Sequence, residues 1–462
     1  MHRFVFENLR DWAQQNRHKP IVLRGARQVG KSYVVRLLAQ ECFEFLVEVN
    51  FEQRPDMVSL FESMEPEKII PLLELRMGES IVSGKTLLFL DEIQAAPAVL
   101  ACLRYFYEKM PALHVIAAGS LLEFVLEEHQ FSMPVGRIEY RHLGPMTFDE
   151  FLLAVNRPQL RQFLQTYGVS DTIDPSVHND LINVVRDYFV VGGMPEAVAE
   201  FALTGSYLAS DKVLSSILST YKDDFAKYGN RTNRTHLTKV FAKIPALIGN
   251  KMKYTQIDRE EKSRSLKQAL CQLENARIVY RVAHSHATGI PLRACVKEEH
   301  FKTIFLDVGL MCHACGLSMD DIQSASEALF INRGAVCEQY VGQHLLYSGP
   351  FHEEPGLYCW LRQCGSANAE VDYVCQQGQT IIPIEVKAGK TGTLKSLHMF
   401  VHERDCSFAV RFNADLPSLA EVQTSVAGMP PKPFCLLSLP FYLIGHLRRL
   451  CKEALHSHNH TH

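Results

Sequence analysis

The sequence has no apolar run that approaches the roughly 20 residues a helix needs to cross a bilayer. It also has no excess of one charge, because 48 lysines and arginines stand against 51 aspartates and glutamates. The first absence excludes membrane-spanning helices, and the second excludes a basic field over the whole molecule. Binding to nucleic acid would therefore need a local basic patch.

Signals for secretion are also missing. The first residues lead directly into a charged helical stretch, without the apolar segment of a signal peptide. The 13 cysteines follow no repeating spacing, so they do not outline a disulfide framework. One close pair, Cys312 and Cys315, has no second pair at the spacing of a zinc finger. We therefore expect a cytoplasmic protein with free thiols and no membrane partner.

What the sequence does contain is a phosphate-binding loop between an apolar run and a helical pattern. Eight consecutive residues fit G-x-x-x-x-G-K-[ST], the P-loop pattern. They are Gly25, Ala26, Arg27, Gln28, Val29, Gly30, Lys31 and Ser32. The two glycines allow backbone N–H groups to face phosphate oxygens, at the positive end of the following helix. We expect Lys31 to reach the β- and γ-phosphates of a nucleoside triphosphate and the Ser32 hydroxyl to bind Mg²⁺.

Two carboxylates end a buried strand pattern farther along the chain. The apolar run 86–90 suits a strand that is buried on both faces of a parallel sheet, and Asp91 and Glu92 follow it. Alone, these acids could cap the helix that comes next. Together with the P-loop roughly 60 residues upstream, they indicate that Asp91 holds Mg²⁺ and that Glu92 polarises the attacking water.

A further strand pattern, 114–118, ends at Gly119 and Ser120. The alternation of strands and helices predicts a parallel three-layer α/β sheet that binds its ligand at the carboxyl ends of the strands. Ser120 lies at such an end and is a candidate to contact the γ-phosphate or the water. A serine that caps the next helix is the alternative.

These motifs together resemble the prokaryotic AAA+-type ATPases, and among them a group whose C-terminal half is a domain of unknown function. The segments that carry the resemblance are the P-loop and residues 88–94, 118–120, 136–138 and 144–151. The resemblance covers nearly the whole chain and implies ATP and Mg²⁺ as ligands. It also implies that Arg137 lies near the nucleotide, in the same chain or across a subunit contact. A surface arginine in a turn is the alternative.

The length of 462 residues predicts several domains. We place an AAA+-type P-loop ATPase domain at residues 1–147, and the resemblance implies a helical lid or linker at 148–230. Residues 231–325 have the pattern of a winged helix. Residues 326–462 have that of a restriction-endonuclease-like, or PD-(D/E)XK-type, α/β domain.

The second helix of the winged-helix segment has two different faces. Leu266, Leu270 and Leu273 define a buried stripe, and Arg264 and Lys267 fall on the opposite side. Basic residues on such a helix could enter a major groove of DNA. The alternative is a solvated face on a module that packs against other domains.

The last segment holds a second group of acids. Asp372 lies in one strand pattern, and Glu385 and Lys387 are two residues apart in the next, so both face one side. Glu338 lies upstream on a helix. In a restriction-endonuclease-like site, Asp372 and Glu385 would hold Mg²⁺ and Lys387 would orient a water or stabilise the phosphate. The alternative is an inherited fold in which these residues only form salt bridges.

The sequence thus predicts a Mg²⁺-dependent ATPase of the AAA+ type that acts on nucleic acid or is regulated by it. ATP is the expected ligand and DNA a candidate partner, whereas nuclease activity and a homo-oligomeric state are left open. The alternative is a nucleotide-dependent switch or scaffold for protein partners, with an inactive nuclease fold. What ATP hydrolysis drives does not follow from the sequence.

Overall fold

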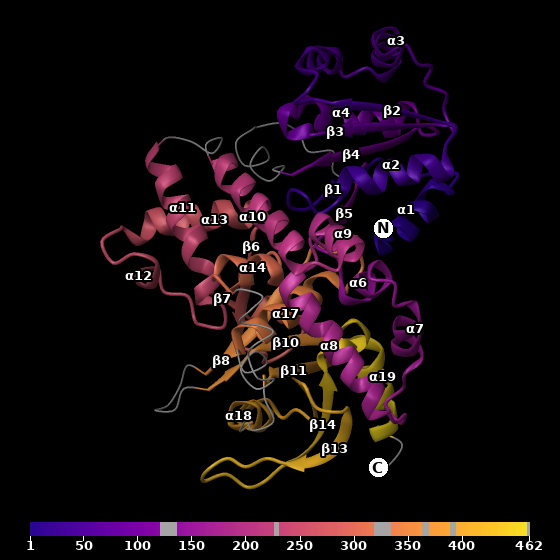
Figure 1. Cartoon of the computed structure of the whole chain (residues 1–462). Helices are drawn as coiled ribbons and strands as arrows, with labels where there is room; N and C mark the ends of the chain where they lie inside the picture. The colour runs from indigo at the N-terminus through magenta and orange to yellow at the C-terminus, as the bar shows by residue number, and fades with distance from the viewer. Residues whose placement is uncertain (121–135, 226–230, 318–333, 363–368, 389–393, 460–462) are drawn as a thin grey trace. The chain divides into compact units, whose positions relative to one another are not determined.

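The computed structural model describes residues 1–120, 136–225, 231–317, 334–362, 369–388 and 394–459 (Figure 1). The chain divides into two compact units. The N-terminal unit comprises Met1–Gly144 together with two short later segments, Asn275–Ile278 and Gly349–Pro355. The C-terminal unit comprises the other residues from Pro145 onward. No helix in the described part of the chain has the length and apolar character needed to cross a membrane.

The N-terminal unit is built on a five-stranded parallel sheet. Its strands are β1 (Ile21–Arg24), β2 (Phe45–Asn50), β3 (Thr86–Asp91), β4 (His114–Gly119) and β5 (Glu139–His142). They lie in the order β2-β3-β4-β1-β5, and every neighbouring pair is parallel. The helices are α1 (Phe4–Ala13), α2 (Lys31–Cys42), α3 (Pro66–Met77) and α4 (Pro97–Lys109), with the 3₁₀ turns η1 (Pro55–Ser63) and η2 (Ile93–Ala95). The parallel α/β sheet predicted for this region is confirmed.

Helices cover both faces of this sheet. One face packs against η1, α3 and α4 and forms an apolar core, while α2 contacts β2, β3 and β4 from the other face (Figure 1). The central strands β3 and β4 are buried at every residue, which explains their continuous apolar sequences. This is the three-layer arrangement in which ligands bind at the carboxyl ends of the strands.

The register brings the ends of three strands to one edge. Arg24 on β1 is opposite Gly119 on β4, and Asp91 on β3 is opposite Ala118. Since β4 lies between β1 and β3, the residue after β4 is flanked by the loop after β1 and by the acids that end β3.

The C-terminal unit contains two sheets. The first has the order β7-β6-β8-β9, with β6 (Val279–Ser285), β7 (Val296–Phe305), β8 (Leu357–Leu361) and β9 (Glu370–Val371). The second has the order β10-β11-β12-β14-β13, with β10 (Tyr373–Gln377), β11 (Thr380–Val386), β12 (Phe408–Asn413), β13 (Ser418–Gln423) and β14 (Pro433–Pro440). Both mix parallel and antiparallel pairs.

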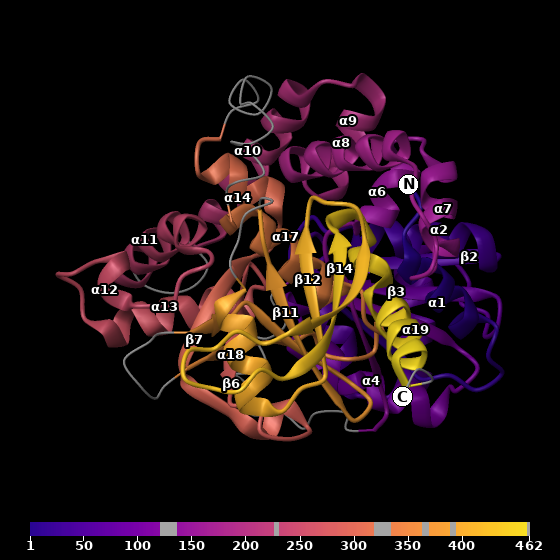
Figure 2. The same cartoon turned by 90° about the horizontal axis from the view of Figure 1, so that it is seen from below.

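The helices of this unit fall into two groups along the chain. The first group is α6 (Phe148–Ala154), α7 (Pro158–Thr166), α8 (Pro175–Val191), α9 (Pro195–Thr204), α10 (Tyr207–Asp224), α11 (Arg231–Leu247), α12 (Tyr254–Ile257) and α13 (Ser263–Asn275). The second group is η4 (Leu292–Cys295), α14 (Val308–Ala314), α17 (Gly334–Tyr347), α18 (Lys395–Arg404), η5 (Phe441–His446) and α19 (Leu447–Asn459). Helix α18 packs on β11 and β12 (Figure 2), and α17 contacts strands of both sheets.

The segment predicted as a winged helix has helices α11, α12 and α13 followed by the antiparallel hairpin β6–β7. The apolar stripe of α13 is buried and its basic residues are exposed, as its periodicity predicts. The hairpin, however, is not a free wing, because β6 also pairs in parallel with β8. The predicted domain boundary between residues 325 and 326 lies outside the described residues. The pairing of β6 with β8 places strands from before and after this boundary in one sheet.

One buried carboxylate ties together three helical segments of this unit. Asp307 caps α14 and accepts hydrogen bonds from the backbone N–H groups of Leu310 (3.0 Å) and Gly193 (2.6 Å), which lies in the turn between α8 and α9. Gln343 on α17 also donates to it, at 3.1 Å. A Cβ at Gly192, where φ is +72°, would lie 2.1 Å from Asp307 Oδ1, so this turn needs glycine to approach the carboxylate.

We predict that Asp307→Ala destabilises the C-terminal unit by about 3 kcal/mol, because buried N–H groups lose their acceptor. Asp180→Ala is the control, since Asp180 is an exposed residue within helix α8 of the same unit. Urea unfolding followed by circular dichroism measures both variants. Equal midpoints for the two variants would contradict the role of Asp307.

Candidate functional site

The P-loop joins β1 to α2, the strand–loop–helix context that its sequence predicts. Gly25 has φ +155°, and a Cβ there would lie 2.1 Å from the carbonyl oxygen of Leu143. Gly30 has φ +91° and is the N-cap of α2. Both positions therefore need glycine, one for close backbone approach and one for its dihedral angle. Between them, Ala26 and Val29 are buried, Gln28 is exposed, and Arg27 forms an ion pair with Glu52.

A buried arginine outside the P-loop donates hydrogen bonds to the backbone of this loop and of a neighbouring segment. Arg3, just before α1, donates to the carbonyl oxygen of Val29 at 2.7 Å and to that of Gly144 at 2.8 Å. Only 3% of Arg3 is exposed. Sequence reasoning missed this residue, since an arginine near the N-terminus carries no motif that connects it to the P-loop.

The side chains expected to bind phosphate and Mg²⁺ are close to each other. The Lys31 ammonium donates to the carbonyl oxygens of Gly25 (2.9 Å) and Ala26 (2.8 Å). The Ser32 hydroxyl donates to Asp91 Oδ2 at 2.9 Å. Burial raises the pKa of Asp91 above its ordinary value, although the hydrogen bond from Ser32 opposes that shift. These groups meet at the edge where β1, β4 and β3 end.

Glu92 is held by a neighbour that the sequence reasoning did not single out. It has φ +54°, a left-handed conformation, and its carboxylate accepts a hydrogen bond from the side-chain amide of Gln94. A Cβ on Gly119 would lie 2.7 Å from Gln94 Oε1, so the end of β4 needs glycine to leave room for this side chain. The sequence signal for Gln94 is its position two residues after the acid, in the turn η2.

Ser120 follows β4 between the P-loop and the acids, the place predicted for it. It is 2% exposed, and its hydroxyl oxygen has no hydrogen-bond partner among the described residues. A buried hydroxyl without a partner is costly in a folded protein. The helix that Ser120 would cap in the alternative interpretation falls in residues 121–135, outside the described part of the chain.

The expectation that Arg137 contacts the nucleotide of its own chain needs correction. Arg137 lies just before β5, and the first residue of that strand, Glu139, is opposite Ile21, the first residue of β1. It is therefore at the amino-terminal edge of the sheet, whereas the P-loop is at the carboxyl-terminal edge. There it pairs with Glu108 near the end of α4, at 3.0 Å. A role across a subunit contact stays a prediction.

The four residues of the predicted nuclease-like site also come together, in the C-terminal unit. Glu338 is on α17, Asp372 lies between β9 and β10, and Glu385 is on β11 with Lys387 just after it. The Lys387 ammonium pairs with Glu385 Oε1 at 2.6 Å, and Asp372 Oδ2 accepts a hydrogen bond from the backbone N–H of Val386 at 2.8 Å. The second oxygen of Glu385 is buried and has no hydrogen-bond partner in the described structure.

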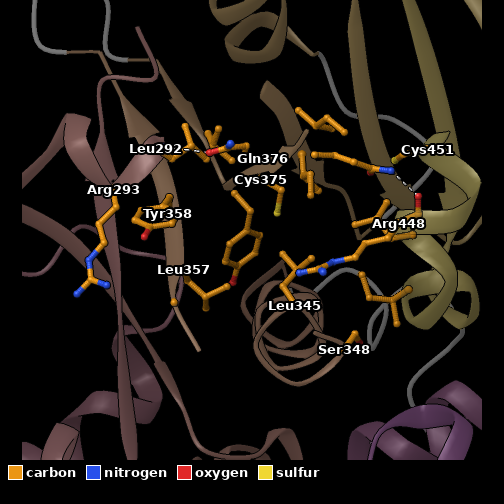
Figure 3. Close-up of a pocket in the computed structure, with 18 of the residues that line it drawn as sticks. Leu292, Arg293, Leu345, Ser348, Leu357, Tyr358, Cys375, Gln376, Arg448 and Cys451 are labelled. Carbon is orange, nitrogen blue, oxygen red and sulfur yellow. Dashed lines mark hydrogen bonds between the residues drawn. The ribbon is translucent and has the colours of Figure 1, made fainter. Parts of the chain in front are cut away.

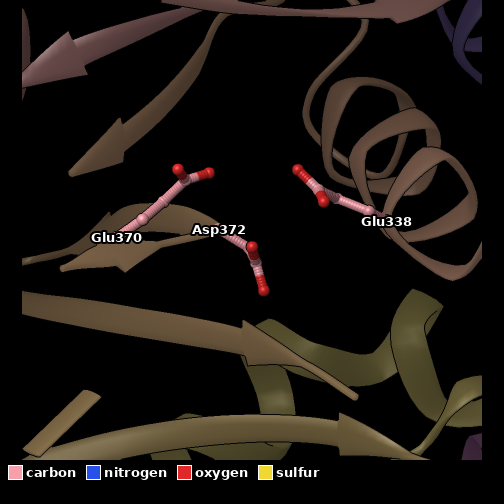
Figure 4. Close-up of side chains that lie close together, drawn as sticks. All are labelled: Glu338, Glu370 and Asp372. Atoms are coloured by element: carbon pink, nitrogen blue, oxygen red, sulfur yellow. The ribbon is translucent and has the colours of Figure 1, made fainter. Parts of the chain in front are cut away.

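Two further charged residues belong to this cluster and were missed. Lys302, on β7, donates to Glu338 and lies 2.7 Å from Glu370 Oε1 and 3.5 Å from Asp372 Oδ1. Figure 4 shows the carboxylates of Glu338, Glu370 and Asp372 turned toward a common space. Lys302 lies in the segment 231–325 that is predicted to be a winged helix, so its sequence context does not connect it to the acids.

Burial and charge act against each other in this cluster. Burial alone would lower the pKa of Lys302, but the charges of Glu338, Asp372 and Glu370 hold that pKa well above its ordinary value. Burial raises the pKa of Glu338, and burial with the charge of Asp372 raises that of Glu385. The four acids of the cluster outnumber its two lysines.

A cavity of about 300 Å³ lies elsewhere in the C-terminal unit (Figure 3). Tyr373 lines it and also donates from its hydroxyl to the carbonyl oxygen of Glu338, at 2.8 Å. Figure 3 shows the side chain of Arg448 extending across the cavity toward Leu345. No sequence motif points to this cavity, because its lining residues come from distant segments.

Comparisons with protein families match three separate parts of the chain. Residues 17–152 match the AAA domain. Residues 182–321 match a domain of unknown function, DUF8612, and residues 333–421 match another, DUF4143. No curated protein matches the sequence. The nuclease-like character of the C-terminal region is thus not established by these matches and stays a prediction.

Solved structures give only distant likenesses. The Walker-type ATPase PABY2304 of Pyrococcus abyssi is 15% identical over 67% of this chain and 94% of its own, with a TM-score of 0.43. The Aeropyrum pernix ORC2 protein is 13% identical over 69% and 93%, with a TM-score of 0.36. The Thermotoga maritima RuvB Holliday junction branch migration motor is 16% identical over 61% and 90%, with a TM-score of 0.27. Likenesses at this level say nothing about what the chain binds. The family matches show an AAA-type P-loop domain joined to two domains of unknown function.

Proposed function

We propose that the N-terminal unit binds ATP with Mg²⁺ and hydrolyses it at the edge formed by β1, β4 and β3. The observation that carries this proposal is the 2.9 Å hydrogen bond from the Ser32 hydroxyl to Asp91 Oδ2. These two oxygen ligands suit Mg²⁺ and meet although they are 59 residues apart in the sequence. The match of residues 17–152 to the AAA domain supports the same class of activity.

Lys31 is in place to bind the phosphates. Its ammonium is held by two carbonyl oxygens of its own loop, which are neutral acceptors. Phosphate oxygens are charged acceptors, and charge-assisted hydrogen bonds are roughly twice as strong as neutral ones. Lys31 can therefore exchange the carbonyls for phosphate oxygens when a triphosphate enters. The N-terminus of α2 adds its positive dipole at the same place.

The acids then carry the hydrolytic step. Mg²⁺ bound by Ser32 and Asp91 would neutralise charge on the β- and γ-phosphates. Glu92 orients a water and accepts its proton as the water oxygen bonds to the γ-phosphorus and the bond to the bridging oxygen breaks, giving ADP and phosphate. Gln94 holds the Glu92 carboxylate in position. The hydroxyl of Ser120, which has no hydrogen-bond partner within the described ranges, can donate to the γ-phosphate or to the water.

Separate variants test binding and chemistry. Lys31→Ala should lose both ATP binding and hydrolysis, whereas Glu92→Gln should keep binding while hydrolysis falls at least about 100-fold. Phosphate release measures the rate, and titration with a fluorescent ATP analogue measures affinity. Glu62→Gln is the matched control, because Glu62 is exposed in the same unit. A wild-type rate no higher than that of Lys31→Ala would refute the ATPase proposal.

Arg3 should act on ATP binding through the position of the loop. Arg3→Met leaves the carbonyls of Val29 and Gly144 without their donor, so we expect the Kd for ATP to rise about tenfold or more. The same titration measures it, and Arg10→Met is the control, since Arg10 pairs with Glu7 on the exposed side of α1. An unchanged Kd in a folded Arg3→Met protein would show that the loop holds its shape without this contact.

A second candidate function, binding to DNA, is favoured by the charge of residues 231–275. This segment has ten lysines and arginines and four aspartates and glutamates, a net +6, although the whole chain has a net charge of −3. On α13, Arg264 and Lys267 are exposed opposite the buried leucines. Such a face can contact phosphates or enter a major groove.

Charge reversal tests this second function. Arg264→Glu with Lys267→Glu should weaken binding to duplex DNA and make the slope of log K against log salt shallower by about two. Lys395→Glu with Lys452→Glu makes the same charge change at exposed positions of the C-terminal unit and serves as the control. If affinity and slope stay at wild-type values, α13 does not contact DNA. ATPase rates that are insensitive to DNA would favour a switch with protein partners.

A further inference from the structure

The carboxylate cluster of the C-terminal unit already contains a cation, the ammonium group of Lys302. This group donates to Glu338, lies 2.7 Å from Glu370 Oε1 and lies 3.5 Å from Asp372 Oδ1. The Lys302 side chain is 1% exposed, so its positive charge is balanced by the carboxylates and not by solvent water. Three acids from α17 and from the β9–β10 segment therefore surround one positive charge. Figure 4 shows the three acids alone.

The same three acids are the ones that could hold a metal ion. One oxygen of each lies within 4.8 Å of the others, a spacing that suits a shared cation. A protonated lysine has no lone pair and cannot be a ligand, so it competes with a metal for the carboxylate oxygens. A divalent ion at this place would also be repelled by the ammonium at short range. The residues present therefore do not fit a bound Mg²⁺.

Lys302 has little freedom to leave. It lies opposite Val282 on the hairpin β6–β7, and its neighbours Phe301 and Thr303 are buried as well. A side chain packed in this way stays among the acids, whereas a solvent-exposed lysine could move away from them into water.

We propose that Lys302 is a tethered cation that takes the place of a divalent metal ion in this cluster, and that the cluster in the wild-type chain does not cleave nucleic acid. The endonuclease-like residues Asp372, Glu385 and Lys387 then hold the two sheets and α17 together as an ion network. Removing the ammonium turns the same acids into a site for a divalent cation such as Mn²⁺. This proposal does not depend on ATP hydrolysis in the other unit.

Mn²⁺ binding tests the proposal directly. All proteins carry Asp91→Asn, so that Mn²⁺ binding at the nucleotide site does not contribute to the signal, and the Asp91→Asn protein is the parent. Electron paramagnetic resonance measures the concentration of free Mn²⁺. The parent should show no saturable binding up to about 1 mM, and Lys302→Met should bind one Mn²⁺ at least about tenfold more tightly. Lys297→Met is the control on the same strand, because Lys297 is exposed.

Further variants locate the ion. Adding Asp372→Asn to Lys302→Met should abolish the new binding, and Mn²⁺ should raise the thermal midpoint of Lys302→Met but not that of Lys297→Met. Saturable Mn²⁺ binding by the parent that Asp372→Asn removes would overturn the proposal. So would Mn²⁺-dependent cleavage of DNA by the wild-type chain that Lys387→Ala abolishes.

A second variant covers the case in which Lys302→Met does not fold. Lys302→Met with Glu338→Gln removes one positive and one negative charge together and leaves Glu370, Asp372 and Glu385 as oxygen ligands. Mn²⁺ binding to this folded protein supports the proposal. If it binds no more Mn²⁺ than the parent, Lys302 does not stand in for a metal ion.

Discussion

A buried ammonium is stable in a protein interior only when carboxylates surround it, and Lys302 imposes that condition on the C-terminal unit. Its partners come from α17, from β9 and from the turn before β10, while Lys302 itself lies on β7. The strands β7 and β10 belong to different sheets. One ion network therefore fixes how the two sheets meet on α17, and the hairpin predicted as a wing becomes part of the same core.

Two lysines of this chain show how the acceptor decides what an ammonium can do. Lys31 is held by neutral carbonyls of its own loop, which a charged phosphate can displace. Lys302 is held by carboxylates, which are charged acceptors like phosphate oxygens and are already in place. Lys31 can exchange these carbonyl acceptors for a ligand that enters and leaves. Lys302 stays in ion pairs with the carboxylates of its own chain, which suits a structural role better than a catalytic one.

The sequence predicts well the parts of this structure that depend on neighbouring residues. The P-loop, the acids after β3 and the parallel order of the first sheet all follow from local patterns, because glycine spacing and apolar runs report backbone conformation and burial directly. Arg3, Lys302 and Glu370 were missed because their partners lie far away in the sequence. Arg137 was misplaced for a related reason: the resemblance suggested a role, whereas its position relative to the nucleotide depends on strand direction.

The separation of charge within the C-terminal unit bears on what this unit can do with nucleic acid. Residues 231–275 carry a net positive charge and expose Arg264 and Lys267. The acids of the Lys302 cluster are buried (Glu338 and Glu385) or half-buried (Glu370 and Asp372), and they outnumber the two lysines. A phosphodiester approaching those acids without a divalent ion would be repelled, because two lysines do not neutralise four carboxylates. The segment that would attract DNA and the residues predicted to form a nuclease-like site are therefore in different places in this unit. If both proposals hold, this chain binds DNA on its basic segment, and the segment predicted to be nuclease-like serves only as a scaffold.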